Sequence, residues 1–102
     1  MVTTHVLDTA SGRPAAGVRV RLERADGTVV GEGRTDDDGR LRDLGSPDPG
    51  EHRLVFATGE WFAAAGREAF WPEVVVTFTL GAGHHHVPLL LSPFGYSTYR
   101  GS

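Results

Sequence analysis

Clusters of glycine, proline and aspartate recur along this 102-residue chain and divide it into short segments. Four of these clusters predict turns, at Gly12–Pro14, Ala25–Gly27, Asp36–Gly39 and Ser46–Gly50. Several of the segments between the clusters are rich in apolar and β-branched residues. Turn signals at such close spacing indicate a protein built from many short strands.

The clearest strand lies over residues 18–23, where apolar residues alternate with arginine and glutamate. This alternation gives one apolar face and one solvated face. A return strand at Thr28–Val30 follows the Asp26-Gly27 pair, because this dipeptide accepts the positive φ angles of a hairpin turn. Further strands are predicted at Thr4–Thr9, Arg53–Ala57, Glu73–Leu80, His86–Leu91 and Phe94–Arg100.

One segment, Thr58–Gly66, predicts a helix instead, because it contains three consecutive alanines and is bounded by glycine. We expect two or three turns that end near Gly66. Many short strands and one helix predict an all-β fold, an antiparallel β-sandwich of two sheets with one short helix. The length fits a single domain over residues 1–102.

Composition excludes several classes of function. The chain has no cysteine, which excludes disulfides, thiolate metal sites and a cysteine nucleophile. A net charge of −3 argues against a nucleic-acid-binding protein. No apolar run approaches the ~20 residues that a membrane helix needs, and no secretory signal is visible. We therefore expect a cytoplasmic protein that binds neither nucleic acid nor membranes.

Five histidines are the main candidates for chemistry, and three of them are consecutive. If residues 84–86 lie on a strand, His84 and His86 share one face and His85 points to the other. Two imidazoles on one face can act on one substrate, or can hold a metal with a third ligand such as His5. The plainer interpretation is a surface run without a role, and the ligand spacing of a zinc site is missing.

His5 and Arg40 are the other candidates. We interpret the segment around His5 as an ordinary edge strand, with His5 and Leu7 on one face and Thr4, Val6 and Asp8 on the other. Arg40 follows an acidic turn. This turn lacks the spacing of a calcium-binding EF-hand, so we interpret the turn as a solvated one held by an aspartate side chain. An arginine there offers a fork of donors to a planar anionic ligand.

These segments together resemble one known family. The residues that carry the resemblance are Thr4–Thr9, Gly12–Ala15, Thr35–Arg40, Trp71–Val74, His86–Pro93 and Tyr99–Ser102. They are similar to the 5-hydroxyisourate hydrolases, the transthyretin-related enzymes of urate breakdown, in order and over nearly the whole chain. The final Tyr-Arg-Gly-Ser is the most specific element, because it distinguishes these enzymes from thyroid-hormone carriers of the same fold.

The resemblance implies a transthyretin-like sandwich and a homotetramer, a dimer of dimers with active sites in the channel between dimers. It implies hydrolysis of 5-hydroxyisourate to 2-oxo-4-hydroxy-4-carboxy-5-ureidoimidazoline in purine degradation, with no metal or other cofactor. It assigns catalytic roles to His5, Arg40, His86 and Ser102, and substrate contacts to Leu7, Tyr99, Arg100 and Gly101. The family commonly has tyrosine where this chain has His85.

The chemistry of these residues fits opening of a ring by water. Two imidazoles can deprotonate water and pass a proton to the departing nitrogen, while an arginine stabilises charge on the carbonyl oxygen. Which histidine is the base stays open, as does whether Ser102 acts through its side chain or a terminal carboxylate. Two other functions also stay open: a non-enzymatic prealbumin-like β-sandwich module and a small-molecule carrier.

Overall fold

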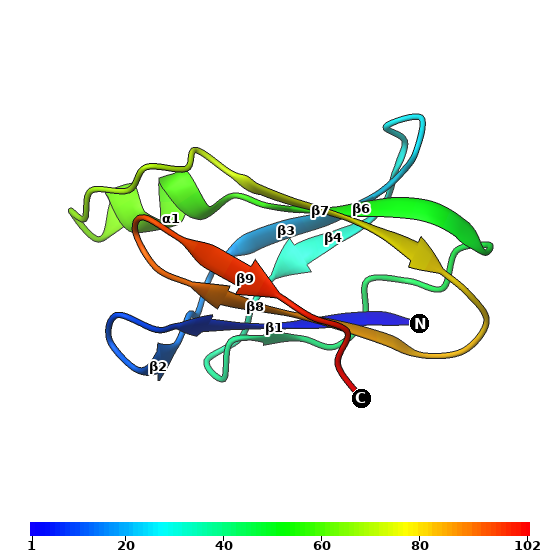
Figure 1. The fold of residues 1–102 in the computed structure, drawn as a ribbon, viewed down its shortest axis with the longest axis horizontal. Coiled ribbons are helices and arrows are strands. Elements are labelled where there is room, and N and C mark those ends of the chain that lie inside the picture. The colour runs from blue at the N-terminus through cyan, green and yellow to red at the C-terminus, as the bar shows by residue number, and fades with distance from the viewer.

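The computed structural model describes residues 1–102 and consists of two facing sheets and one helix (Figure 1). The first sheet contains β1 (Val2–Asp8), β2 (Arg13–Pro14), β5 (Arg40–Leu41), β8 (His85–Leu91) and β9 (Tyr96–Thr98). The second contains β3 (Arg19–Arg24), β4 (Val29–Arg34), β6 (Gly50–Phe56) and β7 (Val74–Leu80). The helix α1 (Thr58–Ala64) connects β6 to β7. The predicted sandwich with one short helix is confirmed.

The core lies between the sheets, and alternation along the strands decides which side chains enter it. In β3, Val20 and Leu22 are fully buried, and they join Val18 just before the strand, as the sequence predicts. The predicted hairpin also forms, since β3 and β4 pair antiparallel around the turn at Gly27. The structure contains no helix with the length and apolar character that crossing a membrane requires.

The position of β1 differs from the sequence-based expectation. An edge strand was predicted, but β1 lies inside its sheet, with β2 and β5 on one side and β8 on the other. Its pairing with β8 is parallel and departs from a purely antiparallel sandwich. A parallel pair needs a long connection rather than a hairpin, and here nearly the whole chain provides it. In this register Thr3 lies opposite His86.

The helix ends close to the predicted glycine. The backbone N–H of Gly66 donates to Ala63 O, and that of Arg67 donates to Phe62 O, both at 3.0 Å. These two bonds satisfy carbonyl groups that the last helical turn leaves open. The chain reverses at this point, so that Arg67 turns back toward β1.

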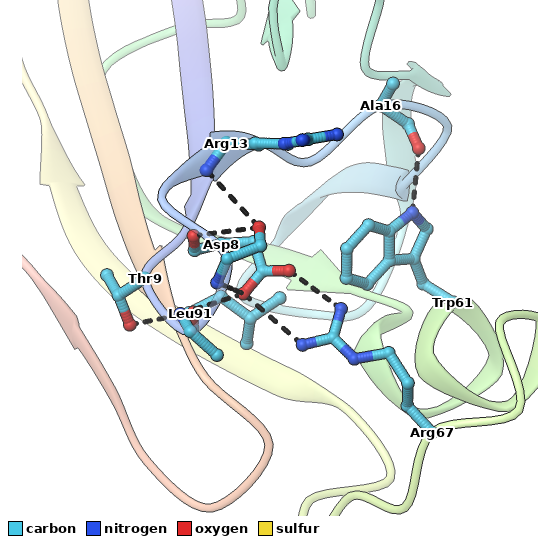
Figure 2. Close-up of polar contacts among 9 residues, drawn as sticks. Asp8, Thr9, Arg13, Ala16, Trp61, Arg67 and Leu91 are labelled. Carbon is cyan, nitrogen blue, oxygen red and sulfur yellow. Dashed lines mark hydrogen bonds and ion pairs between the residues drawn. The ribbon is translucent and has the colours of Figure 1, made fainter.

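An ion pair between Arg67 and Asp8 joins the turn after α1 to the end of β1 (Figure 2). Arg67 Nη1 lies 2.7 Å from Asp8 Oδ2, and the guanidinium also stacks 4.8 Å from the centre of the Phe62 ring. Trp61 Nε1 donates to Ala16 O at 2.7 Å beside it. The helix is thereby fixed at one end of the long axis, and the two chain termini lie toward the other (Figure 1).

Candidate active site

A cleft of about 380 Å³ opens where β1, β5 and the start of β8 meet the C-terminal residues. Its lining consists of Thr3, Thr4, Arg40, Leu41, Arg42, His84, His86 and Ser102. The lining includes two arginines, two histidines and the hydroxyl residues Thr3 and Ser102, and no carboxylate side chain. The hydroxyl of Thr4 is buried and donates to Val87 O. Such a lining favours a polar, oxygen-rich or anionic ligand.

The turn before β5 places Arg40 in this cleft. Asp36 Oδ1 accepts the backbone N–H groups of Asp38 and Arg40, each at 2.9 Å, as the interpretation of an aspartate-held turn predicts. These bonds lower the pKa of Asp36, and the bond from the N–H of Arg40 has the largest effect. Gly39 closes the turn at φ +75°, and a Cβ there would lie only 2.5 Å from Val6 O. The turn can therefore pack directly on β1.

His5 is the residue of β1 that lies opposite Arg40. Its Nε2 is 2.9 Å from Asp38 O. Because a carbonyl oxygen only accepts, Nε2 carries a proton and donates it, and Nδ1 is left free for proton transfer. The side chain lies beside the cleft, and its electrostatic interaction with His86 contributes to the lowered pKa of His86.

The alternation predicted for the three consecutive histidines is confirmed. His85 is buried, whereas His84 and His86 lie on the other face with ring centres 6.5 Å apart. Thr3 Oγ1 lies between them, 2.9 Å from His84 Nε2 and 2.8 Å from His86 Nδ1. Burial, and then the positive charge of Arg40, lower the pKa of His86. His86 is therefore neutral near pH 7 and able to accept a proton.

The C-terminal residues approach the same imidazole. Gly101 pairs with His86, and its N–H donates to His86 O at 2.8 Å. A Cβ at Gly101 would lie 2.5 Å from His86 Cδ2, so only glycine fits against the ring. This contact brings Ser102 into the cleft.

Not all of the predicted site residues gather here. Tyr99 and Arg100 line a second cleft of about 300 Å³ bounded by β7, β8 and β9, which His86 also borders. Leu7 lies on the same face of β1 as His5 but two residues further along, outside both clefts. In one copy of the chain the structure thus unites Arg40, His86 and Ser102, with His5 beside them.

Five of the lining residues had no predicted site role, namely Thr3, Thr4, Leu41, Arg42 and His84. Thr3 follows the same alternation as His5, so the face of β1 already contained the signal that would have found it. His84 was placed on the correct face but was given no role. Nowhere in the chain do three or more histidine, aspartate or glutamate side chains come together as a set of metal ligands.

The two-sheet fold and the cationic cleft define a transthyretin-like sandwich with a polar site beside the start of β1. Residues 2–101 match the model of the HIUase/Transthyretin family, and the chain belongs to this family. The expected resemblance is confirmed.

Individual relatives agree with this assignment. The chain is 50% identical to the 5-hydroxyisourate hydrolase of Caulobacter vibrioides over 112 residues, which cover 99% of this chain and 97% of that protein. The structure of Klebsiella pneumoniae 5-hydroxyisourate hydrolase matches with a TM-score of 0.93 at 40% identity, covering 99% and 97% of the two chains. Sea bream transthyretin in complex with thyroxine matches with a TM-score of 0.90 at 30% identity, covering 98% and 93%.

Proposed function

We propose that this chain is an enzyme that hydrolyses 5-hydroxyisourate to 2-oxo-4-hydroxy-4-carboxy-5-ureidoimidazoline. The observation that carries the proposal is the meeting of Arg40 and a neutral His86 in one polar cleft, with His5 directly opposite Arg40. The relatives named 5-hydroxyisourate hydrolase, similar over nearly the full chain, support the same substrate.

In this reaction the oxygen of a water molecule bonds to a ring carbonyl carbon, and the ring carbon–nitrogen bond breaks. One proton of the water ends on the departing nitrogen, and the carbonyl becomes a carboxylic acid that ionises. His5 and His86 act as the acid–base pair, since each has one ring nitrogen engaged by the protein and one free. Acid–base catalysis of this kind contributes ~10²–10⁴-fold.

Arg40 binds the oxygen-rich face of the planar substrate and stabilises the negative charge that develops on the attacked carbonyl oxygen. Gly101 holds the C-terminal segment against His86, and Ser102 closes the cleft beside it. A carrier of apolar compounds is less well supported, because Leu41 is the one apolar residue in the cleft lining.

We also propose that four copies assemble as a dimer of dimers. The strands β7 and β9 end their sheets with unpaired edges, and both border the cleft that contains Tyr99 and Arg100. Apolar side chains are exposed on these strands, Val75 at 42% and Tyr96 at 41%. Association along these edges would satisfy backbone groups and cover those side chains.

The reaction can be tested by the identity of the product. Urate labelled with ¹³C at the ring carbonyl that is attacked is converted to 5-hydroxyisourate by uricase, and the labelled carbon is followed by NMR with and without the chain. We expect the signal to move from the amide to the carboxylate range faster when the chain is present. A label that stays in an amide, or moves at the spontaneous rate, would reject the proposed reaction.

A further inference from the structure

The hydroxyl group of Thr3 contacts two imidazoles at once. Its Oγ1 lies 2.8 Å from His86 Nδ1 and 2.9 Å from His84 Nε2. The parallel register of β1 and β8 fixes this arrangement, since it sets Thr3 opposite His86. The rings themselves are too far apart to bond directly, with centres separated by 6.5 Å.

A hydroxyl group carries one proton and can donate one hydrogen bond. Thr3 therefore donates to one of the two rings and must accept an N–H from the other. If Thr3 donates to His84, then His86 is protonated at Nδ1 and keeps a lone pair on Nε2. If Thr3 donates to His86, the proton of the neutral His86 ring lies on Nε2 instead. The direction of one hydroxyl thus decides which nitrogen of His86 can act as a base.

Charges around the ring favour the first arrangement. His86 Nε2 has no hydrogen-bond partner within the chain, and the cleft beside it contains the guanidinium groups of Arg40 and Arg42. A positive charge attracts a lone pair and repels an N–H proton. The other titratable side chains that act on the ring are those of His5 and His84, and neither is an anion that would favour the opposite tautomer.

We propose that Thr3 is a positioning residue of the hydrolase: it accepts Nδ1–H of His86, donates to His84 Nε2, and keeps the Nε2 lone pair of His86 in the cleft. This inference rests on the proposed function and adds two residues, Thr3 and His84, that the family resemblance did not assign. The lowered pKa of His86 agrees with it, since the tautomer matters only while the ring is neutral.

The test compares Thr3→Val, which removes the hydroxyl but keeps the shape, with Thr3→Ser, which keeps the hydroxyl. We expect Thr3→Val to lower kcat for 5-hydroxyisourate at least about tenfold, with KM changed by less than about twofold, because base catalysis is weakened and binding is not. Thr3→Ser should keep most of the activity. Thr9→Val is the matched control, because its hydroxyl also bonds β8, at Leu91 O, but far from the cleft.

A second measurement is independent of activity. In ¹⁵N NMR of the wild-type protein near pH 7, His86 should be protonated at Nδ1, and in Thr3→Val the population should shift toward Nε2–H. Wild-type kcat in Thr3→Val, or a wild-type His86 protonated at Nε2, would overturn the inference. If Thr3→Val fails to fold, the wild-type tautomer and Thr3→Ser still decide it. A wild-type protein without hydrolase activity would reject the proposed function, whereas the NMR result would still test the tautomer.

Discussion

At the scale of single residues, Gly101 lies so close to His86 that the C-terminal segment can take this position only because residue 101 has no side chain. Replacing Gly101 by alanine would put a Cβ 2.5 Å from His86 Cδ2, a distance that neither group can accept without moving. We expect Gly101→Ala to lower kcat/KM about 10²-fold, since misplacement by about 1 Å near the chemistry has that effect. The free energy of unfolding should change by less than ~1 kcal/mol, because the segment lies at the surface.

Gly95→Ala is the matched control for this substitution. It lies in the same C-terminal segment, and a Cβ there would meet Ser92 Oγ at an ordinary 3.7 Å. Activity assays and urea unfolding of the two variants separate a loss of catalysis from a loss of stability. Equal activity of Gly101→Ala and the wild type would show that contact between the segment and His86 is not needed.

The titration of His86 predicts how stability depends on pH. Its pKa in the folded protein is lowered by burial and by Arg40, whereas in the unfolded chain it has the ordinary value of ~6.5. The unfolded state therefore binds more protons as pH falls below ~6.5, so the wild type loses stability there. As pH falls from about 7 to about 5, the free energy of unfolding of the wild type should decrease relative to that of His86→Asn, whose side chain cannot titrate.

Urea unfolding of both proteins across this range measures the effect. Because other groups titrate in both proteins, the difference between their free energies of unfolding isolates His86. A difference that does not change with pH would contradict the lowered pKa.

Local patterns predicted much of the site at this scale. Alternation alone placed His5 and Leu7 on one face, and separated His85 from His84 and His86. The bridge through Thr3 could not be predicted, because it depends on the register between the first and eighth strands. Alternation within a strand says which face a residue is on, but not which residue of a distant strand lies beside it.

At the scale of elements, the ion pair between Asp8 and Arg67 joins the turn after α1 to the end of β1. The Asp8 side chain is 3% exposed and that of Arg67 is 32% exposed, so removing the guanidinium leaves a nearly buried carboxylate unpaired. Burial alone would raise the pKa of Asp8, but hydrogen bonds from Arg67 and Ser11 outweigh it, and the pKa is lowered. This stabilisation is present above about pH 4 and is lost as pH falls through the lowered pKa.

We expect Arg67→Met to lower the free energy of unfolding by ~2 kcal/mol at pH 7, and by less at pH 3, where Asp8 begins to be protonated. Arg19→Met is the control, since the Arg19–Glu60 pair also joins the helix to a strand but is about half exposed on both sides. Its loss should cost less than ~1 kcal/mol. Thermal or urea unfolding measures the stability of both variants. Equal losses in the free energy of unfolding would show that the buried pair stabilises the fold no more than the exposed pair does.

Elements with clear alternation or composition were predicted within a few residues, including β3, β7 and the helix. The two-residue strands β2 and β5 were not, because two residues are too few to show a period. The interior position of β1 was also missed. Its half-exposed residues are Thr3, His5 and Leu7, of which only Thr3 lines the cleft. They are exposed on one face of the sheet, while the hydrogen-bonding edges of the strand are paired on both sides.

At the scale of the whole molecule, the unpaired edges of β7 and β9 bear on the proposed tetramer. Sedimentation or light scattering at micromolar concentration should give about four times the 11.0 kDa of one chain. The His86→Asn protein should have the same mass, because His86 lies on β8 and not on either edge strand, although it also borders the second cleft. A monomer at all accessible concentrations would contradict the assembly.

We propose that the cleft between β1, β5 and β8 accelerates the opening of 5-hydroxyisourate. The most direct test generates this compound from urate with uricase and follows its ultraviolet absorbance with and without the chain. We expect a decay rate that rises in proportion to the concentration of added chain, and that returns to the spontaneous value with His86→Asn. A decay rate that the wild-type chain leaves unchanged would contradict the proposed function.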